Sequence, residues 1–155
     1  MKKIINRIKN QKGLTLIELL AVVVILGIIA AIAVPSVGKI IDNTKKDAHV
    51  ANAQQMINSA KLAVSADTGL LPSSGTKIIS MSYLEDNGYL DVVKDPDGGE
   101  YNKGTSATDT AGSYVQISKD GEGKYSYSVR LLGNERNIPL TAEGALDRDE
   151  VKANS

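Results

Sequence analysis

The chain of 155 residues contains no cysteine, no tryptophan and no phenylalanine, and it has a single histidine, His49. The lack of cysteine excludes disulfides, thiol catalysis, cysteine-ligated zinc and a lipid anchor on cysteine. One imidazole without a second histidine or a thiol is a poor basis for catalysis, which needs several converging groups. We therefore expect that the chain is not an enzyme, that it has no cofactor, and that His49 is a solvated or interface residue of a helix.

Acidic residues are absent from the first 13 positions, which hold five basic ones. The whole chain has 18 basic and 18 acidic side chains, so residues 14–155 keep 13 basic against 18 acidic, a formal charge of −5. A net negative charge gives no general attraction for nucleic acid. No direct nucleic-acid site is evident in the sequence.

A long apolar run follows the basic residues. From Leu14 to Val34 the only polar side chains are Thr15 and Glu18. At about 1.5 Å per residue, this run spans about 30 Å, the thickness of a bilayer core. The basic flank favours the cytoplasm under the positive-inside rule, so we expect a single-pass precursor in the cytoplasmic membrane with its C-terminus outside.

Two other interpretations of this run are an ordinary secretory signal peptide and a plain N-terminal anchor. The sequence Ala31-Ile32-Ala33 is an A-x-A cleavage site, and cleavage there would release a soluble product that starts at Val34. Neither alternative gives Glu18 a partner, although a carboxylate deep in a membrane costs about 2.5–3.5 kcal/mol on insertion scales.

Residues 11–20, QKGLTLIELL, resemble the type IV prepilin motif, also called the class III signal peptide. The resemblance implies that a membrane peptidase cuts after Gly13, that Leu14 becomes N-methylated, and that Glu18 is needed for assembly. The family most often has phenylalanine where this chain has Leu14, which is a mild departure.

The residues themselves suggest why such a motif needs its acid. Cleavage after Gly13 creates an α-amino group on Leu14, with a reference pKa of about 7.7–8.0, so it is mostly cationic at neutral pH. Glu18 lies one helical turn away, and between neighbouring helices the same charge pair would set the stagger of a filament. A buried charge pair is better evidence for register than for stability.

The helical pattern resumes after Pro35 and continues to a stop signal at Asp67-Thr68-Gly69. We expect one helix over about residues 14–67, kinked near Pro35. The predicted organisation is a basic leader (1–13), a transmembrane or filament-core helix (14–34), its amphipathic continuation (35–69) and a globular head (70–155). Alternating residues predict a hairpin at 113–118 and 124–132, with a further edge strand near 138–140. The fold class is α+β, a type IV pilin-like helix packed against a small antiparallel sheet.

One segment of the head is acidic. Asp95, Asp97, Glu100 and Asp109 could gather around calcium, but their spacing does not fit an EF-hand. Turns favour aspartate and glycine for backbone reasons, so we interpret residues 95–101 as an acidic turn and predict no metal ligands.

The resemblance implies a structural subunit of a type IV pilus that serves adhesion, motility, aggregation or DNA uptake. Its partners would be other copies in a helical filament, a prepilin peptidase, a pilus assembly platform with its ATPase, and the membrane. Its final location would be an extracellular pilus on the cell surface. A pseudopilin of type II secretion or competence has the same motif and is the alternative. A secreted binding module with an ordinary signal peptide is the alternative from another class.

Overall fold

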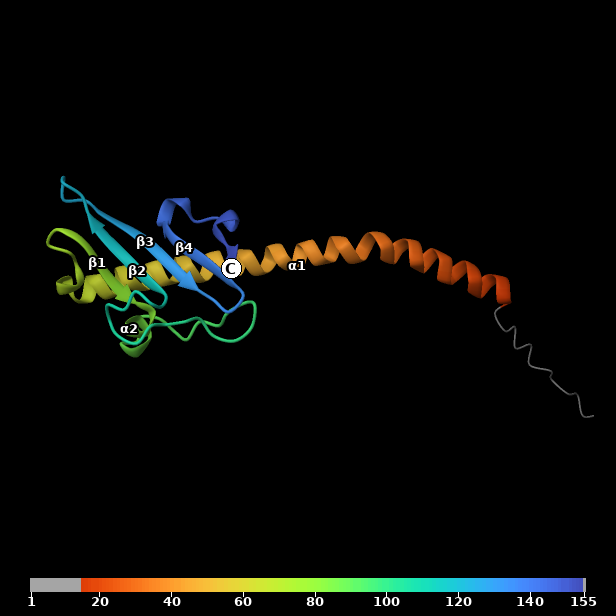
Figure 1. Cartoon of the computed structure of the whole chain (residues 1–155), viewed down its shortest axis with the longest axis horizontal. Helices are drawn as coiled ribbons and strands as arrows, with labels where there is room; N and C mark the ends of the chain where they lie inside the picture. Colours follow the sequence, from red (N-terminus) through yellow and green to blue (C-terminus); the bar gives the residue numbers. More distant parts are fainter. Residues whose placement is uncertain (1–14, 155) are drawn as a thin grey trace, which may run out of the picture. The chain divides into compact units, whose positions relative to one another are not determined.

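The computed structural model describes residues 15–154, and it has the predicted α+β architecture of one long helix and a small antiparallel sheet (Figure 1). The elements in chain order are α1 (Leu16–Ala66), η1 (Thr68–Leu70), β1 (Gly75–Ser80), α2 (Met81–Asp86), β2 (Tyr114–Lys119), β3 (Tyr125–Leu132), β4 (Arg136–Ala142), η2 (Glu143–Ala145), η3 (Arg148–Glu150) and β5 (Lys152–Ala153). The chain divides into two compact units, one up to Ile40 and the other from Ile41 onward.

In the first unit, α1 runs without interruption through Pro35. None of the described residues before Asp42 is buried, and the exposed side chains are almost all aliphatic. The helix ends at Ala66, where the Asp67 carboxylate accepts a hydrogen bond from the Gly69 amide and opens η1. The predicted end of the helix is therefore confirmed to within one residue, and the kink at Pro35 stays a prediction.

In the second unit, five strands form a sheet in the order β1-β2-β3-β4-β5, and every neighbouring pair is antiparallel. The predicted hairpin is β2 and β3, which pair from Tyr114 opposite Arg130 to Lys119 opposite Tyr125. The strand predicted near residue 138 is β4. It pairs with β5 only at Arg136 and Asn137, so Pro139 lies beyond that ladder, where its missing N–H costs no sheet hydrogen bond.

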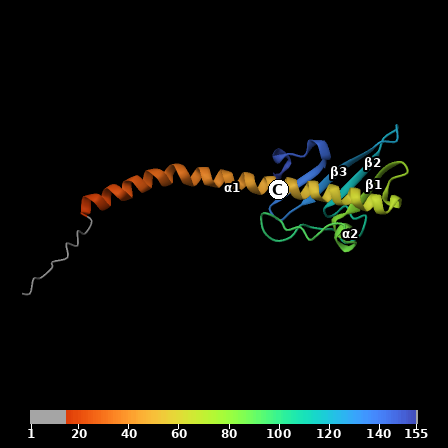
Figure 2. The same ribbon diagram turned by 180° about the vertical axis from the view of Figure 1, so that it is seen from behind.

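The C-terminal half of α1 lies across one face of this sheet, as the two opposite views show (Figures 1 and 2). The side chains that α1 buries follow helical spacing, and the strands contribute alternate residues to the same core. The fully buried apolar residues of this interface are Ala53, Met56, Ile57, Ala60 and Ala63 of α1, and Ile79, Val115, Ile117, Val129, Leu131 and Ile138 of the sheet. The head therefore depends on α1 for one wall of its core.

The short helix α2 follows directly from β1. Its N-cap is Ser80, whose hydroxyl accepts a hydrogen bond from the Tyr83 amide at 3.1 Å. Ser82, which starts an S-x-x-E pattern with Glu85, lies inside the first turn and is not the cap. Gly88, with φ of +74°, follows the C-cap at Asn87.

Candidate functional site

The first candidate site is the start of α1. Thr15 precedes the helix and Glu18 lies in its first turn. The Glu18 Oε2 atom accepts hydrogen bonds from the Thr15 amide at 2.8 Å and from the Thr15 hydroxyl at 2.7 Å, while the Glu18 amide donates to that hydroxyl at 3.3 Å. This reciprocal pattern is a capping box, which satisfies backbone donors that a helix start leaves open. The T-x-x-E spacing before an apolar run was the signal for it in the sequence.

The capping box changes the account of Glu18. One carboxylate oxygen has two donors from Thr15, and Oε1 makes no hydrogen bond to another described residue. Gly13 and Leu14, the predicted cleavage and methylation residues, lie outside the described residues. The pairing of Glu18 with an α-amino group on Leu14 therefore stays a prediction.

The segment that follows Glu18 is apolar on every side. α1 is the one helix within residues 15–154 that is long and apolar enough to cross a membrane, although a signal sequence near an N-terminus meets the same criterion. A helix from the core of a soluble protein would be mostly buried, whereas the apolar part of α1 is not buried at all. Leu16 is 86% exposed and Ile32 is 72% exposed, so this surface requires lipid or other protein to cover it.

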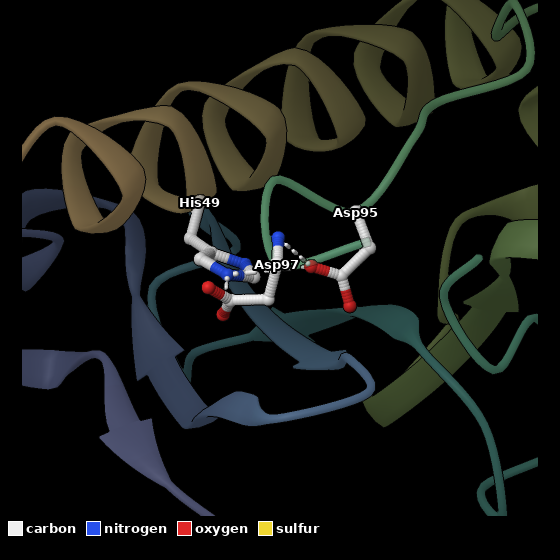
Figure 3. A group of neighbouring side chains, drawn as sticks. All are labelled: His49, Asp95 and Asp97. Carbon is white, nitrogen blue, oxygen red and sulfur yellow. Dashed lines mark hydrogen bonds and ion pairs between the residues drawn. The ribbon is translucent and has the colours of Figure 1, made fainter. Parts of the chain in front are cut away.

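The second candidate site surrounds His49, which is 1% exposed (Figure 3). The prediction of a solvated or interface histidine is wrong, because the loop after α2 folds over this part of α1. The His49 Nε2 atom lies 2.9 Å from Asp97 Oδ2 and 3.5 Å from Asp95 Oδ1. Its Nδ1 atom lies 2.8 Å from the Tyr101 hydroxyl, which also accepts a hydrogen bond from Asn52 at 3.0 Å.

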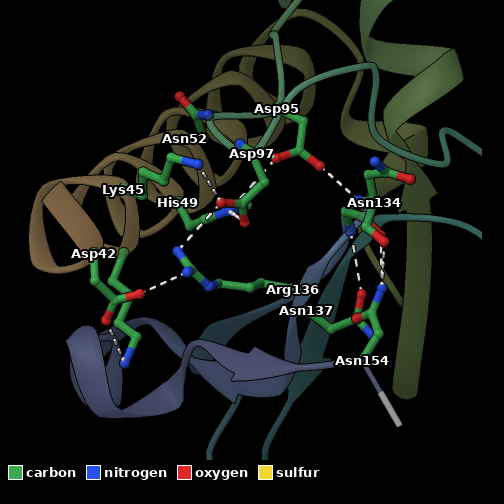
Figure 4. Close-up of polar contacts among 12 residues, drawn as sticks. Asp42, Lys45, His49, Asn52, Asp95, Asp97, Asn134, Arg136, Asn137 and Asn154 are labelled. Atoms are coloured by element: carbon green, nitrogen blue, oxygen red, sulfur yellow. Dashed lines mark hydrogen bonds and ion pairs between the residues drawn. The ribbon is translucent and has the colours of Figure 1, made fainter. Parts of the chain in front are cut away.

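Two cations complete this buried cluster (Figure 4). Lys45 Nζ of α1 lies 3.3 Å from Asp97 Oδ1, and Arg136 Nη1 of β4 lies 3.2 Å from the same oxygen. Arg136 also reaches Asp42 of α1 at 2.6 Å through Nη2. The Asp97 side chain is fully buried, so its charge connects α1 and β4 in a setting where solvent screens it little.

The protonation of the cluster follows from its contacts. Burial alone would raise the pKa of Asp97, but the hydrogen bonds from His49 and Lys45 and the charge of Arg136 outweigh burial and lower it. Because a carboxylate only accepts, Nε2 of His49 carries the proton of that hydrogen bond. Burial raises the pKa of Tyr101, so its hydroxyl stays protonated and can donate to Nδ1 of His49.

His49, Asp95 and Asp97 have one ligand atom each within 4.8 Å of one another, a spacing that could hold a metal ion. The carboxylate oxygens, however, already have amide donors or cationic neighbours; Asp97 Oδ1 makes no hydrogen bond to another described residue, but two cations lie within 3.3 Å of it. Asp95 accepts from the amides of Asp97 and Asn134 at 2.8 and 2.6 Å, and Asp97 has the two cations and His49. A divalent cation would compete with positive charge that the chain itself provides, so the donor set favours an ion-pair network. Of the other acids suggested for calcium, Asp109 instead caps its own loop through the amides of Thr105 and Ala111.

The loop after β3 approaches the cluster closely because it has a glycine there. A Cβ atom on Gly133 would lie 2.6 Å from Asp95 Oδ2 and 2.5 Å from the Arg136 carbonyl oxygen. This contact places the Asn134 amide on Asp95. A Gly-Asn pair is typical of a turn, but the sequence does not show which distant residue such a turn meets.

Comparison with known proteins identifies the N-terminus. Residues 8–34 match the model of the prokaryotic N-terminal methylation motif, the class III signal peptide that is the hallmark of type IV pilin-like proteins. No curated protein and no solved structure matches the chain. The chain thus combines the motif that is the hallmark of type IV pilin-like proteins with a pilin-like layout of one long helix and a small sheet.

Within that class, the motif supports a type IV pilin or a pseudopilin, and it implies processing by a prepilin peptidase and assembly in a pilus or secretion system. The same motif and the apolar start of α1 fit a precursor anchored in the membrane. This class is structural rather than catalytic.

Proposed function

We propose that this chain is a pilin, a structural subunit of a type IV pilus on the cell surface. The prepilin peptidase cuts the precursor after Gly13 and the new N-terminus is methylated at Leu14. An assembly platform with its ATPase then moves the subunit from the membrane into a helical filament. The observation that carries this proposal is the methylation motif at residues 8–34 together with a helix, α1, whose apolar surface has no cover within the described chain.

The exposed apolar surface supports assembly through α1. Burial of apolar area contributes about 25 cal/mol per Å², so a helix that exposes leucine, isoleucine and valine on all sides is stable only in lipid or among other helices. In the precursor, lipid covers it. In a filament, the same segments of neighbouring copies cover it, and the small residues among them, such as Ala30 and Ala31, allow close approach.

Glu18 supports the transfer from lipid to filament. Thr15 donates twice to Oε2 and so partly satisfies the carboxylate. Its other oxygen remains for the cationic α-amino group that cleavage creates on Leu14, in the same or a neighbouring copy. This pairing would neutralise both charges inside an apolar core and fix the axial position of each subunit.

Intact-mass analysis of the mature protein tests the processing. We expect a mass that starts at methylated Leu14. A product that starts at Val34 would instead indicate cleavage of an ordinary signal peptide after Ala33 and would contradict the proposal. Electron microscopy of cells that overexpress the full chain then separates the two remaining functions: long extracellular fibres support the pilin, whereas only short structures that span the envelope indicate a pseudopilin.

The Glu18→Ala and Glu18→Gln variants test the charge pair. Both should be cleaved after Gly13, because the leader and the glycine are unchanged, and both should fail to form fibres, because neither can neutralise the amine. The glutamine variant keeps an acceptor for Thr15 and therefore controls for loss of the helix cap. Normal fibres from Glu18→Gln would show that the cap, and not the charge, is what assembly requires.

A further inference from the structure

A shallow groove lies on the sheet where β2, β3, β4 and β5 meet, with a volume of about 420 Å³. Its apolar lining includes Tyr114, Leu132, Pro139 and Leu140, and Leu140 is 44% exposed. Arg130 and Lys152 are also in the lining, which contains no acidic residue. This basic rim stands out on a chain whose residues 14–155 have a formal charge of −5.

Both cations of the groove lack a carboxylate partner among the described residues. Arg130 donates to the Thr110 carbonyl oxygen at 2.8 Å and lies over the Tyr114 ring at 5.9 Å, and Lys152 donates to the Asp149 carbonyl oxygen. These neutral contacts hold the two side chains without cancelling their charge. The groove therefore suits a ligand that combines an apolar side chain with carboxylates.

Another part of the same chain has this combination. From Ile41 onward, the large apolar side chains that are exposed within the described residues are Ile41, Leu62, Val92 and Leu140. Val92 is 63% exposed and follows Asp91, which is exposed and belongs to no salt bridge among the described residues. Leu62 instead follows Lys61, whose charge is paired with Glu143 at 2.6 Å.

The surroundings of Val92 are acidic as well. Asp86 at the end of α2 is exposed and belongs to no described salt bridge. Two nearby cations already have acids beside them. Lys94 lies opposite Glu100 in an antiparallel bridge, and Lys103 is paired with Glu85 at 2.8 Å. The segment 86–92 thus offers one exposed apolar side chain, Val92, and two carboxylates that belong to no described salt bridge. The groove has two cations that lack a carboxylate partner among the described residues, so the numbers of charges match.

We propose that the head binds a second copy of itself through these two surfaces, with Val92 of one copy in the groove beside Leu140 of the next. The segment 86–92 and the groove are different surfaces, so the contact is heterologous. A heterologous contact repeats into an open chain of subunits instead of closing as a dimer. The contact area is small. It suffices in a filament because assembly through α1 holds neighbouring heads at a high effective concentration. The inference rests on the proposed filament function.

The absence of cysteine from the chain allows a direct test by disulfide trapping in the full-length protein. In filaments that carry Val92→Cys and Leu140→Cys together, mild oxidation should give a ladder of covalent dimers, trimers and larger species on non-reducing gels. A disulfide requires Cβ atoms about 3.5–4.5 Å apart, so the ladder reports direct contact. Each single variant should stay monomeric, as should the control Leu62→Cys with Leu140→Cys, which pairs the groove with an equally exposed leucine.

A charge exchange gives a second test that does not depend on thiol geometry. These changes are added to the variant that carries both Val92→Cys and Leu140→Cys. There, Asp91→Lys or Lys152→Glu alone should lower the yield of cross-linked species about two- to fivefold, which is the effect of losing one exposed ion pair. The two charge changes together should restore the yield. Lys152 is exposed and outside the core, so this exchange should not affect folding.

The outcomes separate the inference from the function on which it rests. Filaments that are visible by electron microscopy but give no ladder would overturn the docking contact and leave the pilin function in place. A ladder in the Leu62 control would mean collision without specificity, and dimers from Val92→Cys alone would mean a symmetric contact; either result overturns the proposal. If no filaments form at all, the proposed function fails first.

Discussion

Asp97→Asn is the most informative single change in the head. It removes the charge that Lys45, Arg136 and His49 share at 3.3, 3.2 and 2.9 Å. Loss of one partner from a buried ion pair costs about 3–5 kcal/mol, because the remaining charges lose their compensation. The Lys45 side chain is 37% exposed, so solvent screens part of this loss. We therefore expect the free energy of unfolding to fall by about 2–4 kcal/mol at pH 7.

The matched control is Asp47→Asn, which also removes an aspartate paired with arginine. Asp47 accepts two hydrogen bonds from Arg148, at 2.8 and 2.6 Å, but both side chains are about half exposed. This control should lower stability far less than Asp97→Asn does, because solvent screens both charges. Urea unfolding of the full chain in detergent, followed by tyrosine circular dichroism, reports on the head alone because all six tyrosines lie between residues 83 and 127.

The pH dependence gives this prediction a second readout. The pKa of Asp97 in the folded head is below its ordinary value of 3.8. Its stabilisation is therefore fully present above that value and is lost as the pH falls through the lowered pKa. The difference between the original chain and Asp97→Asn should shrink on acidification from pH 7 toward pH 2.5. A constant difference over this range, or a loss no larger than that of Asp47→Asn, would refute the reasoning.

Two further changes probe packing and hydrogen bonding in the same head. Gly112→Ala should destabilise the head by about 1–3 kcal/mol, the usual cost of overpacking, because the added Cβ would lie 2.1 Å from the backbone nitrogen of Gly104. The control is Gly121→Ala, whose added Cβ has no described atom within 4 Å, and it should leave the stability unchanged in the same urea assay. Tyr101→Phe should cost about 1–3 kcal/mol, because it leaves the buried Nδ1 of His49 without its donor, and a thermal melt of the same protein should show the loss.

The outcomes that would contradict these two expectations are distinct. Equal stability of the two glycine variants would mean that the loop at 102–112 moves aside at no cost. The control for the tyrosine is Tyr83→Phe, since that hydroxyl makes no hydrogen bond to another described residue. If both tyrosine variants lose the same stability, the effect comes from removing a tyrosine hydroxyl in general and not from the bond to His49.

Sequence patterns predicted the elements that are long or regular. The helix expected over residues 14–67 is present as Leu16–Ala66, because the apolar run and the amphipathic pattern both have a helical period. The β2–β3 hairpin followed from the alternation of Tyr125, Tyr127, Val129 and Leu131 with polar residues. β1 was missed, because Gly75–Ser80 shows little alternation and its partner β2 lies about 40 residues further along the chain.

The candidate site in the head was missed for a similar reason. His49 has polar neighbours along the helix, which is typical of an exposed position. Its burial depends on residues that lie between 46 and 52 positions further along the chain. The acidic turn was correctly interpreted as a turn, but the sequence does not show that its carboxylates meet Arg136. The C-terminal tail is fixed by buried Val151 and by β5, and both contacts are too short to leave a pattern in the sequence.

The continuity of α1 has a mechanical consequence. The helix that carries the apolar segment, Leu16–Ala66, also forms one wall of the head. A pull along the part of this helix within the head loads the buried contacts from His49 to Val64, spread over about 22 Å, in shear and all at once instead of one after another. Tension on such a subunit would have to break the Asp97 ion pairs together with the aliphatic core. The buried charges would therefore resist sliding of the helix along the sheet.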